Sequence, residues 1–247
     1  MKKFILFIFS LTVFVGCSHH KGTNEDRFVT PSGDILYITP IKHASLQMEY
    51  KDKIYQIDPV CSNVEPIVEY VDKPKADYII VTDFHDDHFD SYAIHVLNDP
   101  DKTNILLNNR SWIRLKKKGV VMRNWQKATL DDGVSILAVP AYNTTKDYQK
   151  IHPKDSTNGY IFNFDGFRVY IAGDTEPIPE MKKFGKIDVA FLPCNRPFTM
   201  RLSQVVEAAN ILRPKVLYPY NWNETSEESI RKATKDLKMD VRIRYFK

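Results

Sequence analysis

Short apolar runs follow one another closely along most of the chain, and their spacing constrains the fold more than any other feature. Such runs, separated by polar and turn-forming residues, are typical of β-strands in a compact domain. Between two of them, Asp165-Gly166 supplies the positive backbone angles that a two-residue hairpin turn needs. The predicted strands are Ile35–Ile38, Leu46–Tyr50, Lys53–Ile57, Tyr78–Thr82, Ile105–Leu107, Val134–Val139, Gly159–Phe164, Phe167–Ala172, Val189–Leu192 and Val216–Tyr218.

Predicted helices are fewer and concentrate near the C-terminus. One is expected over Arg110–Lys118. Another is indicated by the apolar face within Val205–Leu212, which ends before Pro214. A capping box at Thr225–Glu228 predicts a last helix over Ser226–Leu237. Dominant strands with helices laid over them predict an α+β domain or a two-sheet sandwich covered by helices.

The composition fits one enzyme-sized domain and disfavours a nucleic-acid partner. The 247 residues are 43% apolar, which is enough for a sizeable core, so a single domain over residues 34–247 is expected. The net charge is only +4, and binding to phosphates needs clustered lysine and arginine. The one basic run, Arg114 to Lys118, precedes Gly119 and is interpreted as the cationic end of a helix.

The N-terminus predicts export. Lys2 and Lys3 precede an apolar run, Phe4–Gly16, that is too short to span a bilayer, so residues 1–16 are interpreted as a signal peptide. The tripeptide Val15-Gly16-Cys17 resembles the lipobox of bacterial lipoproteins, which implies a lipid on Cys17 and a membrane anchor at the cell envelope. Residues 17–33 would then form a tether. The remaining cysteines are compatible with one disulfide or with two buried thiols.

Candidate metal ligands interrupt this pattern where predicted strands end. The strand Tyr78–Thr82 runs directly into Asp83–His88, a loop rich in aspartate and histidine. Taken alone, that loop is as compatible with a solvated surface as with a cation site. His152 precedes the predicted hairpin and Asp174 follows another strand, so both belong to strand ends that can converge on one rim. Mixed histidine and carboxylate ligands suit zinc, manganese or iron.

These segments, in this order, resemble the metallo-β-lactamase superfamily, in a branch close to ascorbate-phosphate lactonases. The resemblance covers the chain from about Asp34 onward and implies a four-layered αββα sandwich with one or two metal ions at the edge between its sheets. The segments that carry it are Thr39–Ser45, Ile57–Pro59, Asp83–His88, Pro140–Asn143, His152–Lys154, Tyr170–Thr175 and Tyr218–Asn221.

The resemblance also implies a ligand set with two departures from the family pattern. Aspartate (Asp83) stands where the first histidine of the family's loop motif is expected, and asparagine (Asn221) replaces the last histidine. Asp58 is expected to orient a ligand through hydrogen bonds, and His43 matches the family near the site. By position, one metal would be held by Asp83, His85 and His152, the other by Asp87, His88 and Asn221, with Asp174 between them.

Two functions remain open at this point. In the first, the protein is a lipid-anchored hydrolase in which Asp87 or Asp174 holds an activated water for attack on a small-molecule ester, lactone or phosphoester. In the second, the two replaced ligands mark a pseudoenzyme that binds a ligand or partner at the envelope. Three further residues match the branch and are weaker candidates for a substrate pocket, whereas His95 is expected on the surface. The pocket candidates are Tyr142, Asn195 and Thr199.

Overall fold

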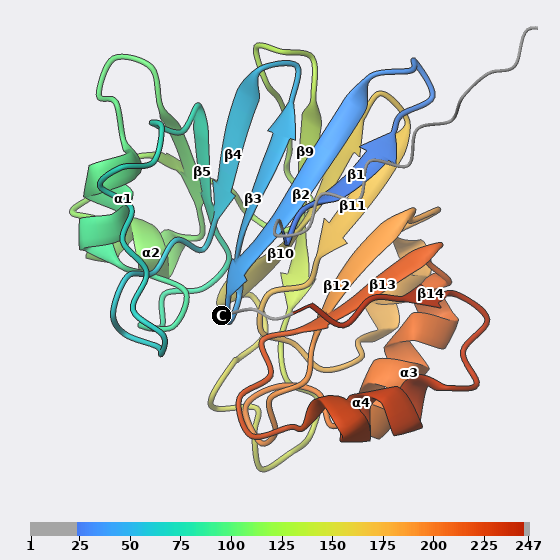
Figure 1. The fold of residues 1–247 in the computed structure, drawn as a ribbon. Helices are drawn as coiled ribbons and strands as arrows, with labels where there is room; N and C mark the ends of the chain where they lie inside the picture. The colour runs from blue at the N-terminus through green and yellow to red at the C-terminus, as the bar shows by residue number, and fades with distance from the viewer. Residues whose placement is uncertain (1–23, 245–247) are drawn as a thin grey trace, which may run out of the picture.

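The computed structural model describes residues 24–244, which form two seven-stranded sheets packed face to face (Figure 1). Helices cover both outer faces, so the predicted α+β class and αββα sandwich are confirmed. Among the described residues, no helix is long and apolar enough to cross a membrane. The predicted signal peptide and Cys17 lie outside the described residues.

The first sheet is formed by the N-terminal half of the chain and the second by the C-terminal half, each in sequential strand order. The first contains β1 (Asp26–Val29), β2 (Ile35–Lys42), β3 (Ser45–Tyr50), β4 (Lys53–Ile57), β5 (Tyr78–Val81), β6 (Asn104–Leu107) and β7 (Val120–Val121). The second contains β8 (Lys127–Thr129), β9 (Ser135–Ala141), β10 (Thr157–Phe164), β11 (Phe167–Ile171), β12 (Val189–Pro193), β13 (Val216–Tyr220) and β14 (Asp240–Val241).

Both sheets change from antiparallel to parallel pairing at their middle strand. In the first sheet, β1 to β4 pair antiparallel and β4 to β7 pair parallel. In the second, β8 to β11 pair antiparallel and β11 to β14 pair parallel. Because parallel strands end at the same edge of a sheet, the loops that follow β4, β5, β11 and β13 gather there.

The apolar core between the sheets follows from alternation along the strands. In β2, every second side chain is buried, including Leu36 and Ile38, and faces the second sheet. Phe162 and Phe164 contribute from β10 on the opposite side, and their rings stack 5.9 Å apart. Among the parallel strands, β5, β12 and β13 are buried on both faces, because helices cover their outer sides.

Helices α1 (Ser91–Leu97) and α2 (Asn109–Arg114) pack on the first sheet. Helix α2 ends four residues before the predicted boundary at Lys118. Arg114 is the last residue of α2, whereas Lys116 and Lys117 have positive φ angles of 53° and 63°, so the rest of the basic run follows the helix instead of forming its last turn.

A 3-10 helix, η1 (Pro179–Lys183), and the helices α3 (Leu202–Leu212) and α4 (Glu227–Thr234) pack on the second sheet. The capping box predicted at Thr225–Glu228 is not formed, and the helix is capped one residue later, at Ser226. Ser226 caps the helix by accepting from the Ser229 amide, whereas the Thr225 hydroxyl donates to the carbonyl of Cys194.

Two local predictions are decided by the structure. The Asp165-Gly166 hairpin is confirmed: φ is 50° and 88° at these residues, and β10 pairs antiparallel with β11. Cys61 and Cys194 are both free and buried, which selects two separate thiols over a disulfide.

The folded domain begins earlier than the predicted boundary at residue 34. Strand β1 pairs antiparallel with β2, so the second half of the predicted tether is part of the first sheet. Asp26 on this strand accepts hydrogen bonds from Tyr218 at 2.7 Å and from two arginines that follow β14. Arg242 donates at 2.9 Å and Arg244 at 2.8 and 2.9 Å. We call this group the Asp26 clasp, because it joins the N-terminal strand to the C-terminal end of the chain.

Candidate metal centre

The predicted ligands come together at one edge of the sandwich, where the parallel strands end. Asp83 and His85 follow β5, Asp174 follows β11, and Asn221 directly follows β13. His152 lies in the segment between β9 and β10. Strand β5 is apolar, buried and paired with both β4 and β6, so it fixes the start of its loop firmly and these side chains are positioned by rigid elements.

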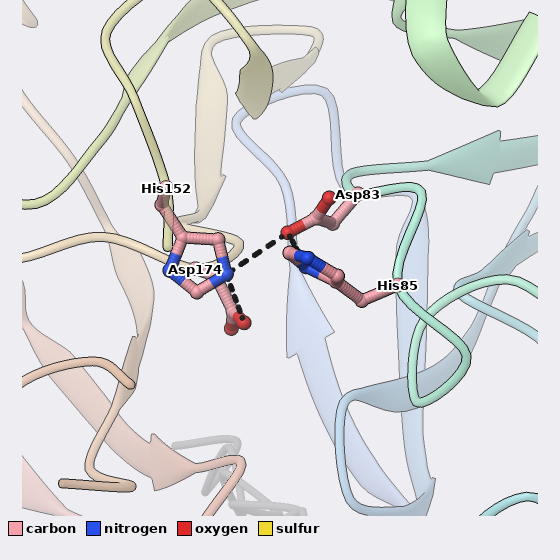
Figure 2. A group of neighbouring side chains, drawn as sticks. All are labelled: Asp83, His85, His152 and Asp174. Atoms are coloured by element: carbon pink, nitrogen blue, oxygen red, sulfur yellow. Dashed lines mark hydrogen bonds and ion pairs between the residues drawn. The ribbon is translucent and has the colours of Figure 1, made fainter. Parts of the chain in front are cut away.

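One group consists of Asp83, His85, His152 and Asp174, whose potential ligand atoms all lie within 4.8 Å of one another (Figure 2). His152 Nε2 lies 3.2 Å from Asp83 Oδ2 and 3.1 Å from Asp174 Oδ2. His85 Nδ1 lies 3.0 Å from Asp83 Oδ2. Asp83 is fully buried here, so the aspartate that replaces the family's first histidine is turned into the centre. We call this the first group.

A second group consists of His43, Asp87 and His88. His43 Nε2 lies 3.1 Å from Asp87 Oδ2, and His88 Nε2 lies 3.1 Å from Asp174 Oδ1 and 3.9 Å from Asp87 Oδ2. Asp174 therefore stands between the groups, with one oxygen toward each. The resemblance implies a place between two metals for the same residue.

Asn221 joins the second group as a hydrogen-bond donor. Its Nδ2 donates to Asp174 Oδ1 at 2.6 Å and lies 3.3 Å from His88 Nε2. Its Oδ1 is buried and has no hydrogen-bond partner among the described residues. Half a turn of the amide would place this oxygen toward His88 and Asp174, where it could serve as a weak neutral ligand. The residues present therefore fit a divalent cation in the first group and a more weakly held one in the second.

Hydrogen bonds orient the two buried histidines toward the centre. The carbonyl of Phe198 can only accept, so His152 must donate its Nδ1 proton to it, at 3.1 Å. In the same way, His88 Nδ1 lies 2.8 Å from Asp58 Oδ2. Asp58 also accepts from the amide and hydroxyl of Thr82, at 2.7 and 2.6 Å. Both rings thus present Nε2 to the centre, and Asp58 has the orienting position that was predicted for it.

The electrostatics of the centre show that it requires positive charge. Burial raises the pKa of Asp83, but hydrogen bonds from His152 and His85 outweigh this and bring it to about 2. Burial lowers the pKa of His152, whereas Asp174 and Asp83 raise it to about 10. The pKa of His88 is raised well above its usual value, since nearby carboxylates outweigh its burial. At neutral pH, protons on His152 and His88 therefore help to balance the carboxylates, and a bound cation would displace them.

A cavity of about 600 Å³ opens onto both groups. His43, His85, Asp87, His152 and Asp174 lie in its wall. Of the three weaker pocket candidates, Asn195 lines it. Tyr142 instead donates to Glu180 at 2.9 Å, and Thr199 accepts from the Asn195 amide at 2.9 Å. His95 is exposed, as predicted. The other lining residues are Asn63, Val64, Glu65, Ile151, Phe198 and Asn223.

Sequence reasoning did not find most of these lining residues. Asn63 to Glu65 lie in an irregular segment, and Phe198 lies in a short turn, so no periodic pattern marks them. His43 was recognised only as a residue near the site. Its positive φ of 48°, in the turn between β2 and β3, was the hidden feature that directs it toward Asp87.

Two groups of aspartate and histidine side chains at the edge of an αββα sandwich are typical of metal-dependent hydrolases. The chain belongs to the beta-lactamase superfamily, because the family described as the beta-lactamase superfamily domain matches residues 37–221.

The names of similar proteins agree with this class. A UPF0173 metal-dependent hydrolase of Pyrococcus furiosus is 31% identical over 196 residues, which cover 76% of this chain and 85% of the relative. One from Archaeoglobus fulgidus is 30% identical over 220 residues, covering 84% and 94%. The predicted class, a metal-dependent hydrolase, is confirmed.

Solved structures agree as well. The crystal structure of a protein from Parabacteroides distasonis, named as a metal-dependent hydrolase, superposes with a TM-score of 0.84. It is 47% identical and covers 90% of this chain and 99% of its own. A metallo hydrolase of Ignicoccus hospitalis has a TM-score of 0.71 at 24% identity, covers 85% of this chain and 95% of its own, and so supports the fold alone.

Proposed function

We propose that the protein hydrolyses a small-molecule ester, lactone or phosphoester with a divalent metal, zinc, manganese or iron, held chiefly by the first group. The observation that carries this proposal is the convergence of four ligand side chains from three separate segments within 4.8 Å. A divalent cation bound there would lower the pKa of a water molecule and polarise the substrate's reacting bond.

The chain's own residues divide the remaining work. Asp174 is buried, and its oxygens are engaged by His88, His152 and Asn221, so it fixes the geometry of both groups. Asp87 lies in the cavity wall and its side chain is 33% exposed, so it can reach a water molecule and accept its proton. Of the two predicted catalytic residues, Asp87 is therefore proposed to act on the reacting water and Asp174 to position the ligands.

His43 is proposed to keep Asp87 in place. Its Nε2 lies 3.1 Å from Asp87 Oδ2, and its side chain is nearly buried. The backbone of His43 is itself fixed, since its carbonyl accepts a hydrogen bond from the backbone N–H of Asn221 at 3.1 Å. This contact links the turn after β2 to the end of β13 across the two sheets.

The test is metal analysis of protein purified without chelator, followed by thermal unfolding with zinc, manganese or iron and a screen of chromogenic esters, lactones and phosphodiesters. We expect about one tightly held metal per chain. The His85→Ala variant should lose metal, hydrolysis and metal-dependent stabilisation together, whereas the exposed control His95→Ala should keep all three. A metal-free wild type that gains no stability from these ions and melts like His85→Ala would overturn the proposal and favour an envelope binding module.

We further propose, from the sequence alone, that Cys17 carries a lipid that anchors the protein to the cell envelope. The wild type should partition into detergent and carry an acyl chain, and Cys17→Ser should release it. A wild type without an acyl chain that stays in the aqueous phase would contradict this.

A further inference from the structure

One wall of the cavity is a segment whose position is fixed from two sides. Residues 61–66, which we call the wall segment, follow β4 and contribute Asn63, Val64 and Glu65 to the cavity. On the outer side, the buried ammonium of Lys42 donates to three carbonyls of this segment, those of Cys61, Val64 and Pro66. On the inner side, Asn63 Nδ2 donates at 3.0 Å to the carbonyl of Asp86 in the ligand loop. The wall is therefore an organised part of the site.

The charge of the cavity is negative beyond its metal ligands. Among the described lining residues outside the two ligand groups, Glu65 is the one charged side chain, and neither lysine nor arginine is present. Lys42, next to His43 in the sequence, directs its ammonium into the carbonyls of the wall segment. Lys154, two residues after His152, pairs with Glu180 at 3.1 Å. Apart from the histidines of the ligand groups and a bound metal ion, a substrate anion would find no cationic side chain in this wall to pair with, and it would meet one further carboxylate, Glu65, that repels it.

The cavity also offers apolar surface. Phe198 is 48% exposed, which is unusual for a large aromatic side chain in this core-rich fold. Its backbone is nevertheless held firmly, because its carbonyl accepts from His152 Nδ1 and, at 2.8 Å, from Asn143 Nδ2. The backbone that carries the exposed ring is thus held beside a metal ligand, and Ile151 also lies in the wall. Such a surface can hold an apolar substituent close to the reacting bond.

We propose that this cavity takes an uncharged acyl compound, an ester or lactone with an apolar substituent, and discriminates against phosphoesters and substrates that carry a carboxylate. The inference rests on the proposed function and narrows its substrate class. Glu65 sets the discrimination by repelling negative charge, and the face formed by Phe198 and Ile151 holds the apolar part.

The reaction balances without any further reactant. The oxygen of one water molecule attacks the acyl carbon, the bond from that carbon to the alcohol oxygen breaks, and the leaving oxygen takes a proton. An ester yields a carboxylate, an alcohol and one released proton, and a lactone yields a hydroxy acid anion and a proton. Because the substrate is neutral and the product is an anion, Glu65 repels only the product, which favours its release.

A matched pair of substrates tests the inference. 4-Nitrophenyl butyrate and the mono-4-nitrophenyl ester of succinate have the same leaving group and similar length, but only the second carries a carboxylate. The kcat/KM for each ester is divided by the rate at which that ester hydrolyses without protein. We expect this ratio, for the metal-loaded wild type, to be about tenfold higher for the butyrate ester than for the succinate ester. Glu65→Gln should reduce this preference and Glu65→Lys should abolish or reverse it, at unchanged metal content. Glu69→Lys, exposed on the same stretch of chain but outside the cavity wall, is the control with equal change in net charge.

Binding gives an independent measurement. Butyranilide and succinanilic acid, the corresponding amides, should differ in the same direction in the thermal stabilisation that they give the metal-loaded protein. Equal kcat/KM for the two esters in wild type and Glu65→Lys would overturn the inference and leave the hydrolase intact, as would a clear preference for bis(4-nitrophenyl) phosphate. Failure of the metal-loaded protein to hydrolyse any ester, lactone or phosphodiester would overturn the proposed function, and the inference with it.

Discussion

The two ligand groups lie side by side yet are built differently. The first places two carboxylates against His152 in a buried setting, and every member offers a lone pair. In the second, Asn221 presents an N–H to His88 and Asp174, where a metal would need a lone pair. Asp87 of the second group is also the more solvent-exposed carboxylate. The first group is thus organised to hold a cation. The second group shares Asp174 with it and faces the substrate.

Replacing Asp174, the residue that both groups share, should have the largest effect, because neither group would then hold a metal. Asp174→Asn keeps the shape of the side chain but removes the charge that faces His152 on one side and His88 on the other. Metal content should fall toward zero in both groups, and hydrolysis should fall by more than about 100-fold. Metal analysis and steady-state kinetics measure this. Retention of one full metal equivalent would show that the first group does not depend on Asp174.

A change limited to the second group should separate it from the first. Asp58→Asn weakens the acceptor that orients His88 and leaves His152 with its own partner, the carbonyl of Phe198. Loss of such a supporting contact commonly lowers metal affinity by about 10- to 100-fold. Titration calorimetry should show this loss in the weaker binding step alone. An equal loss in the tight step would contradict the assignment of His88 to the second group.

Restoring an imidazole should make the groups more alike. Asn221→His replaces the N–H that faces His88 with a ring nitrogen, and the backbone there, at φ 49°, is a conformation that asparagine and histidine both adopt more readily than most residues. We expect metal content to rise toward two per chain and the weaker step to tighten by about tenfold. Asn221→Gln, which retains an amide, is the control. An unchanged number of bound metal ions per chain in the histidine variant would show that the second group lacks room for an ion.

The smallest effect on the metal centre is expected from a substitution in the Asp26 clasp, which lies on a different part of the sandwich. Burial raises the pKa of Asp26, but hydrogen bonds from Arg244 and Tyr218 outweigh it, so the folded-state pKa is lowered. Its stabilisation is therefore present above the unfolded value near 3.8 and lost as pH falls through the lower folded value. Asp26→Asn should lower the free energy of unfolding at pH 7 by about 1–3 kcal/mol and flatten this acid dependence. Chemical denaturation across pH measures both, and metal affinity should stay at the wild-type value.

The sequence predicts the long strands and the convergence of ligands well, because both depend on local patterns. Each predicted strand overlaps a strand in the structure, and the ligands follow strands whose ends must meet. Four strands, β1, β7, β8 and β14, were not predicted, since they are two to four residues long and lie at or near sheet edges. Each pairs with the strand next to it in the sequence, but runs this short show too little alternation to be recognised as strands.

The substrate-facing part of the site was beyond sequence reasoning for a different reason. The wall segment has no periodicity, and Lys42 holds it through backbone carbonyls, whose position no side-chain pattern reveals. His43 appears in the sequence as a lone histidine after a strand, which more often serves structure than chemistry. Only its turn geometry places it 3.1 Å from Asp87.

The Asp26 clasp also sets an order of events for a chain that is still being made. The ribosome synthesises Asp26 early, but Arg242 and Arg244 follow more than two hundred residues later, at separations of 216 and 218. Until then, burying the Asp26 carboxylate leaves its charge unpaired, which disfavours the docked position of β1. The nascent first sheet, complete in sequence by Val121, must therefore wait for the synthesis of Arg242 and Arg244 before its leading strand can settle. A chain that stalls before Arg242 would expose β2 as an open edge and become a natural target for chaperones.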